Sequence, residues 1–120
     1  MKKKTLVFGA SLKTNRYSNL AVQRLVANKI DTVAFGLKSG IIEGVGVDTE
    51  LLHYENLHTI TLYINPTRQE EYYHYLIALR PDRIIFNPGT ENPEFYKLLR
   101  ANGISYEVAC TLVLLSTNQY

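Results

Sequence analysis

Short apolar runs alternate along the chain with longer segments in which apolar residues recur at helical spacing. This alternation is typical of βαβ units and of a parallel sheet that is covered on both faces. The pattern predicts five strands, at residues 4–8, 32–35, 59–64, 83–87 and 105–108. We therefore expect an α/β fold in three layers, α/β/α, with a doubly wound parallel five-stranded sheet in the order 3-2-1-4-5.

The helix between the first two strands is expected at residues 19–29. Ser18 stands where an N-cap residue belongs, because a serine oxygen can accept a hydrogen bond from an amide of the first turn. Four apolar residues in this segment are spaced to form one buried stripe. They are Leu20, Val22, Leu25 and Val26.

Two Asn-Pro pairs predict where the next helices begin. Asn65 and Asn92 each supply a capping side chain, and each is followed by a proline suited to the first helical position. The first of these helices is expected to end near residue 79. The second should end near residue 102, because Gly103 fits the left-handed position that terminates helices.

The remaining segments have weaker patterns. Residues 36–57 carry four glycines and predict a long loop, which in a compact domain is usually functional or contains a short irregular element. Residues 111–115 predict a short closing helix. Residues 118–120 predict a frayed tail.

The carboxyl ends of the strands form the expected binding edge. Ligands of open parallel sheets lie where the direction of winding reverses, which the predicted order places between strands one and four. The two loops at that point are residues 9–18 and 87–92. Asn87 and Gly89 are the candidate contacts in the second loop, which is small and rich in hydrogen-bonding groups.

The loop after the first strand has the composition of an anion-binding turn. Gly9 and Ala10 are small, so backbone N–H groups can approach a phosphate, and the next helix adds free donors and a positive dipole end. The dinucleotide pattern GxGxxG is absent. The alternative is that Ser18 is only a cap and Arg16 only a solvated surface residue. The cations and hydroxyls of the loop are Ser11, Lys13, Arg16 and Ser18.

Lys38 lies just after the second strand, where NAD-binding proteins place an acidic residue on the ribose. A cation at this point favours a phosphorylated ribose, as in coenzyme A (CoA) or NADP, over NAD. The alternative is that Lys38 is one lysine of a polar loop and contacts no ligand.

Composition narrows the classes of partner. The chain has 120 residues, 46% of them hydrophobic, and a net charge of +2. We expect one domain over residues 1–120, with enough apolar side chains for one core. The small basic excess lies mostly at the N-terminus and in the first loop, so nucleic-acid binding is not expected. No apolar run has the length of a membrane span, and a single cysteine points to the cytoplasm.

No catalytic or metal-binding set is evident. The three histidines, His53, His58 and His74, lie in segments that do not converge on the strand ends, so we expect no metal site. Cys110 follows the last strand and is interpreted as a small buried residue, with a redox or acyl-transfer role as the alternative. Tyr72, Tyr73 and Tyr75 are interpreted as a core stripe, with a homodimer contact as the alternative.

With these residues in view, the chain resembles the small bacterial CoA-binding domain family, Rossmann-like proteins similar to the nucleotide-binding part of the succinyl-CoA synthetase α subunit. The likeness depends on Val-Phe-Gly-Ala-Ser at 7–11, on Arg16 and Ser18 at the start of the helix, on Lys38 followed by Ile-Glu-Gly at 42–44, and on Cys110.

The resemblance implies that a glycine-serine loop, an arginine and a helix-capping serine hold the CoA phosphates. Lys38 would then face the 3′-phosphorylated ADP end of the ligand, and Asn65 stands where the family has an arginine after the third strand. Gly36 and Leu37 replace an Asn-Pro or Ser-Pro pair, and Thr111 replaces a proline. The residues nominated for the phosphates are Gly9, Ala10, Ser11, Arg16 and Ser18.

The expected function is therefore the binding of CoA or an acyl-CoA through its phosphates, without a required catalytic step. Two alternatives stay open. One is an NADP-dependent oxidoreductase. The other is an interaction module of a larger enzyme that binds no ligand.

Overall fold

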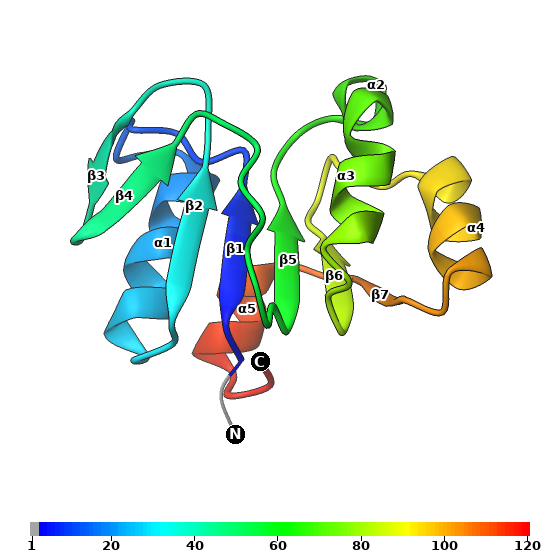
Figure 1. Ribbon diagram of the computed structural model, residues 1–120. Helices are drawn as coiled ribbons and strands as arrows, with labels where there is room; N and C mark the ends of the chain where they lie inside the picture. Colours follow the sequence, from blue (N-terminus) through cyan, green and yellow to red (C-terminus); the bar gives the residue numbers. More distant parts are fainter. Residues whose placement is uncertain (1–2) are drawn as a thin grey trace.

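The computed structural model describes residues 3–120 and contains one mixed sheet with helices on both faces (Figure 1). The strands are β1 (Thr5–Phe8), β2 (Thr32–Phe35), β3 (Gly40–Ile42), β4 (Val45–Asp48), β5 (Thr59–Leu62), β6 (Arg83–Phe86) and β7 (Ser105–Val108). The helices are α1 (Tyr17–Ala27), α2 (Pro66–Gln69), the 3-10 turn η1 (Glu70–Tyr72), α3 (Tyr73–Ala78), α4 (Pro93–Ala101) and α5 (Thr111–Ser116).

The sheet has seven strands in the order β3-β4-β2-β1-β5-β6-β7, so the predicted count of five and the predicted order are wrong. Every neighbouring pair is parallel except β3 and β4. The segment at residues 59–64, predicted to lie outside β2, instead forms β5 and pairs with β1. The α/β character and the mostly parallel sheet are confirmed.

The two additional strands form a hairpin inside the predicted loop 36–57. Its turn residues, Glu43 and Gly44, both have positive φ, at 49° and 80°, as expected of the turn type that matches hairpin twist. β4 then takes the position beside β2, where Val47 pairs with Ala34. The hairpin strands have three and four residues and contain glycines, so their alternation is too short to be recognised in the sequence.

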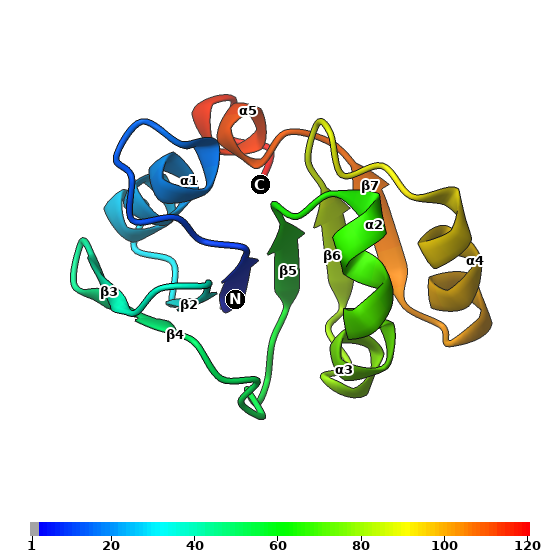
Figure 2. The ribbon, with the colours of Figure 1, turned by 90° about the horizontal axis from the view of Figure 1, so that it is seen from above.

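The connection from β4 to β5, residues 49–58, crosses the sheet without a helix. It lies on the same side of the sheet as α2 and α3 (Figure 2). Two tyrosine hydroxyls fix its course: Tyr54 donates to Asp48 Oδ2 at 2.6 Å, and Tyr75 donates to the carbonyl of Leu52.

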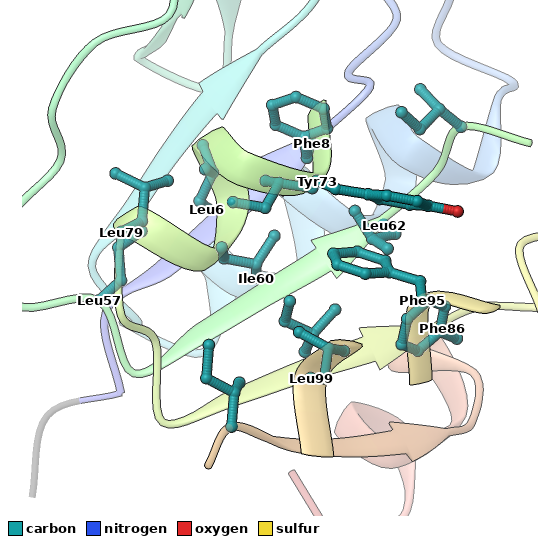
Figure 3. Packing of buried hydrophobic residues seen from close by; sticks show 14 of the residues in the cluster. Leu6, Phe8, Leu57, Ile60, Leu62, Tyr73, Leu79, Phe86, Phe95 and Leu99 are labelled. Carbon is teal, nitrogen blue, oxygen red and sulfur yellow. The ribbon is translucent and has the colours of Figure 1, made fainter. Parts of the chain in front are cut away.

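Two clusters of buried side chains form the core. The larger lies between the sheet and α3 and α4, and it includes Phe8, Leu62 and Phe95 (Figure 3). The smaller lies under α1 and includes Val7 and Leu25. Successive residues of β1 thus face opposite layers, as the pleat of a strand requires.

The helix starts are partly as predicted. Asn65 and Asn92 are confirmed as N-caps, since their side chains accept from the amides of Arg68 at 2.9 Å and Phe95 at 3.3 Å. Ser18 is not an N-cap, because α1 begins at Tyr17 with Arg16 in the capping position. The predicted helix to residue 79 is broken by η1.

Of two further predictions, the glycine at the end of α4 is confirmed and the frayed tail at residues 118–120 is not. Gly103 ends α4 with a φ of 69°, as predicted. The predicted frayed tail is wrong: the Tyr120 hydroxyl bonds the hydroxyl of Thr5, and Lys3 Nζ donates to the Tyr120 carbonyl at 2.6 Å. The Arg83 guanidinium lies 4.5 Å from the centre of the Tyr120 ring, a cation–π distance.

The tyrosine-rich helix contributes to the core. Tyr73 is 7% exposed, and Tyr72 and Tyr75 are half-buried and pack against the larger cluster. Tyr72 lies edge-on to Phe8 and Phe35, with ring centres 5.1 and 6.1 Å away. The interpretation as a core stripe is therefore confirmed, whereas the homodimer stays a prediction.

Candidate functional site

A cavity of about 530 Å³ opens at the carboxyl ends of β1, β2 and β5. The predicted position between strands one and four is corrected here, because β5 and not β6 is the neighbour of β1 across the reversal of winding. Four segments line the cavity: the loop after β1, the loop after β2, the end of β5, and the helical turns that follow it. The lining residues are 8–13, 16, 35–38, 63, 64, 68 and 72.

Two glycines allow these segments to approach closely. A Cβ on Gly36 would lie 2.2 Å from the carbonyl oxygen of Ala10, and a Cβ on Gly9 would lie 2.8 Å from a methyl of Ile64. Gly9 also has a φ of 102°, which side chains with a Cβ rarely adopt. The β1 loop is therefore packed against the segment after β2 on one side and the segment after β5 on the other.

Three backbone amides of the β1 loop donate hydrogen bonds that fix the conformation of the loop. Gly9 N and Ala10 N both donate to the Phe35 carbonyl, at 2.9 and 2.8 Å. Ser11 N donates to the Ser18 hydroxyl at 3.0 Å. These three residues line the cavity, but in this structure their amides bond the protein itself.

The N-terminus of α1 is the other source of donors. Arg16 is the N-cap residue, and its side chain makes no capping hydrogen bond. The first backbone N–H groups of any helix lack intrahelical partners and lie at the positive end of its dipole. Arg16 itself is exposed and lines the cavity, so the cavity reaches the residue that precedes the first turn of α1.

The cavity is strongly cationic. Lys13, Arg16, Lys38 and Arg68 line it, and its lining includes no aspartate or glutamate. Sequence reasoning missed Arg68, because this residue follows an Asn-Pro cap rather than a recognisable motif. It belongs to the site only because β5 lies beside β1, and the predicted order places that strand elsewhere.

Aromatic rings support one wall of the cavity, where Tyr72 is half-buried and Phe8 and Phe35 are buried. Phe8 and Phe35 stack with ring centres 4.7 Å apart, and Tyr72 packs against both. Tyr63 also lines the cavity, but its ring packs with the smaller cluster under α1, and burial raises the pKa of its phenol. Such a wall suits the uncharged parts of a ligand whose anionic groups meet the cations.

The other predicted site residues lie outside the cavity lining. Ser18 is buried and supports Ser11, and Asn65 caps α2. Asn87 is 2% exposed and bonds the Thr61 hydroxyl, the Leu62 carbonyl and the Thr111 amide. Gly89 is exposed, and its amide donates to Glu91. A direct contact of these four residues with a ligand stays a prediction.

The remaining reactive groups are also elsewhere. Cys110 is half-buried in the N-cap position of α5 and is not part of the cavity lining. Within residues 3–120, no group of three or more His, Cys, Asp or Glu side chains is placed to hold a metal ion. None of the helices in the described chain has the length and apolar character needed to cross a membrane.

Residues 3–116 match the family model described as "CoA binding domain". The chain belongs to this CoA-binding domain family. The resemblance inferred from the sequence is thus confirmed, and it covers nearly the whole chain. None of the curated proteins matches the chain.

Several solved structures share the fold of this CoA-binding domain. A crystal structure described as an uncharacterized protein is 43% identical, with a TM-score of 0.96 over 100% of this chain and 99% of that one. The cell-free ID.343 protein from Thermus thermophilus is 21% identical, with a TM-score of 0.87 over 99% and 91%. A hypothetical protein from Pyrococcus horikoshii OT3 is 23% identical, with a TM-score of 0.85 over 97% and 83%. The last two show the Rossmann-like fold alone.

Proposed function

We propose that the protein binds CoA or an acyl-CoA through its phosphate groups, at the cavity where β1 turns into α1. The observation that carries the proposal is the charge of the lining, which holds four cations and no carboxylate around a helix N-terminus. Such a site favours phosphate groups, because free amides, the positive end of a helix dipole and guanidinium groups all attract an anion. Family membership supports CoA as the nucleotide.

The residues of the cavity fit such a ligand. Gly9 and Gly36 keep the lining segments close together, since a Cβ at either position would overlap neighbouring atoms. The cations can neutralise phosphates, and Tyr72, packed on the buried rings of Phe8 and Phe35, offers an apolar surface. When bound, CoA would supply a thiol or thioester, and the protein would supply binding and orientation.

Arg16 and Lys38 have separate tasks in this proposal. Arg16 lies at the start of α1, so it would neutralise the diphosphate at the helix N-terminus. Lys38 lies beyond the end of β2, where it would meet a phosphate on the ribose. That second contact would favour CoA or NADP over NAD.

Thermal unfolding with CoA, acetyl-CoA, NADP and NAD tests the function. A ligand present at 100 times its dissociation constant adds about 2.7 kcal/mol to the free energy of unfolding, a clear shift in midpoint for a domain of this size. We expect shifts with CoA and acetyl-CoA. A shift with NADP alone would favour the oxidoreductase, and no shift with any of the four would favour the ligand-free interaction module.

Replacing Arg16 tests the site. Arg16→Ala should weaken CoA binding by about 1–3 kcal/mol, because a charge-assisted contact to phosphate is lost. Isothermal calorimetry measures the change. Arg24→Ala is the matched control: it removes the same charge from the last turn of α1, outside the cavity, and should leave the affinity unchanged. Equal affinities of the Arg16 variant and the wild-type protein would contradict the assignment.

A further inference from the structure

We infer that Arg68 binds the distal phosphate of the bound diphosphate, opposite Arg16. This contact makes the cavity specific for nucleotides that carry a second phosphate. This inference rests on the proposed function. It concerns a residue that the loop motifs of the chain do not include, and it starts from the position of α2.

Arg68 is the cation that lines the cavity from the β5 side. Lys13 and Arg16 follow β1, and Lys38 follows β2. α2 follows the end of β5 and stands above α3, at the same edge of the sheet as the β1 loop (Figure 1). The site therefore carries positive charge on both flanks of the β1 loop.

The guanidinium of Arg68 is uncommitted. Among residues 3–120 its side chain takes part in none of the hydrogen bonds and neither of the ion pairs. It is exposed at the cavity wall, four residues before Tyr72, which lines the same wall. An arginine with no protein partner beside a cavity without carboxylates is available to an anionic ligand.

The backbone that carries Arg68 is, by contrast, firmly held. The Arg68 amide donates to the capping Asn65 side chain at 2.9 Å. The next residue, Gln69, is fully buried, and its Nε2 donates to the carbonyls of Ile64 at 3.0 Å and Thr90 at 2.8 Å. Its Oε1 accepts from Asn92 at 2.9 Å. Because the backbone of this turn is already ordered, binding an anion restricts the Arg68 side chain alone.

The order of the strands that carry the cations matches the order of anionic groups in CoA. β2, β1 and β5 are neighbours in that sequence, and Lys38, Arg16 and Arg68 line the cavity from the segments that follow them. CoA carries a ribose phosphate, then the first phosphate of the diphosphate, then the distal one. With the ribose phosphate at Lys38 and the diphosphate at α1, the distal phosphate lies toward Arg68.

Binding of CoA and dephospho-CoA to single variants tests this assignment by calorimetry. Both ligands have the distal phosphate, but dephospho-CoA lacks the ribose phosphate. Arg68→Ala should weaken both by the same factor, about 10- to 100-fold. Lys38→Ala should weaken CoA and leave dephospho-CoA unchanged. Arg68→Lys keeps the charge without the planar fork and should fall between wild type and Arg68→Ala.

The controls separate the possible failures. Arg24→Ala should change either affinity less than about 2-fold, and an unaltered thermal midpoint of Arg68→Ala without ligand shows that α2 is intact. The inference is overturned if Arg68→Ala binds both ligands as wild type does, or if its loss is confined to CoA, which would place the ribose phosphate at Arg68. In both cases wild-type binding of CoA still supports the proposed function. A wild-type protein that binds neither ligand overturns both.

Discussion

Two loops at the same edge of the sheet have similar compositions and opposite structural roles. The β1 loop, residues 9–16, and the β6 loop, residues 87–92, are both short, polar and glycine-containing, and both follow a parallel strand. The β1 loop turns its cations toward a cavity. The β6 loop turns its amide and hydroxyl groups inward, and Asn87, Thr90 and Asn92 are at most 5% exposed.

The difference follows from the neighbours of each loop. β1 lies at the reversal of winding, where the connections on its two sides diverge and leave space for a ligand. β6 lies between β5 and β7, and the starts of α4 and α5 close over its end through Asn92 and Asn87. Polar residues at a strand end therefore indicate a binding site only where the topology leaves the space open.

The largest expected effect comes from a matched pair of glycines, one in each loop. Gly9 and Gly89 have similar positive φ values, 102° and 93°, but an added Cβ meets Ile64 and the backbone of Tyr63 only at Gly9. Gly9→Ala should lower the free energy of unfolding by about 3–5 kcal/mol, from backbone strain plus overpacking. Gly89→Ala should lower it by about 1–2 kcal/mol, from strain alone. Urea denaturation measures both, and equal losses would contradict the close packing of the β1 loop.

A smaller loss is expected from the buried amide of the β6 loop. Asn87→Ala removes the acceptor of the buried Thr111 amide and two donated bonds, so unfolding should require about 2–3 kcal/mol less. The CoA affinity of the folded variant should stay within about 2-fold of wild type, because contacts outside a binding site contribute little to affinity. Asn15→Ala, at an exposed position of the β1 loop, is the control and should change stability by less than about 0.5 kcal/mol. A large loss of CoA affinity in the Asn87 variant would indicate that Asn87 contacts the ligand.

The smallest effect should come from Ser18. Ser18→Ala leaves the Ser11 amide without its acceptor and should cost about 1 kcal/mol of stability, with a several-fold loss of CoA affinity as the β1 loop loosens. Chemical denaturation and calorimetry follow the two quantities. Ser116→Ala, at an exposed hydroxyl on α5, should alter neither. An Ser18 variant with normal affinity would show that this support does not matter for binding.

Much of the fold could be predicted because its signals are local. The β-branched runs indicate five of the strands, and the two Asn-Pro pairs indicate helix starts that the structure confirms. The hairpin at residues 40–48 could not be predicted, since two short strands interrupted by glycines show little alternation. The strand order depends on that hairpin, because β4 occupies the place predicted for residues 59–64.

The candidate site could be predicted only in part, because some of its residues are brought together by contacts between distant segments. The β1 loop was found through its small residues and cations, which are properties of one segment. Arg68 became part of the cavity through the pairing of β5 with β1, a contact between distant segments. Asn87 was nominated because a hydrogen-bonding side chain looks alike in a sequence whether it is used by a ligand or by the backbone.

The hydrogen bonds of Tyr120 bring the two ends of the described chain close enough to be joined. Because the last residue bonds Thr5 and Lys3, the two ends of the described chain lie side by side at the edge remote from the cavity (Figure 1). A circular permutant that joins these ends by a short linker and opens at the exposed turn around Gly44 should keep the sheet order. New termini would then lie in the β3–β4 hairpin, while both flanks of the cavity stay on a continuous chain.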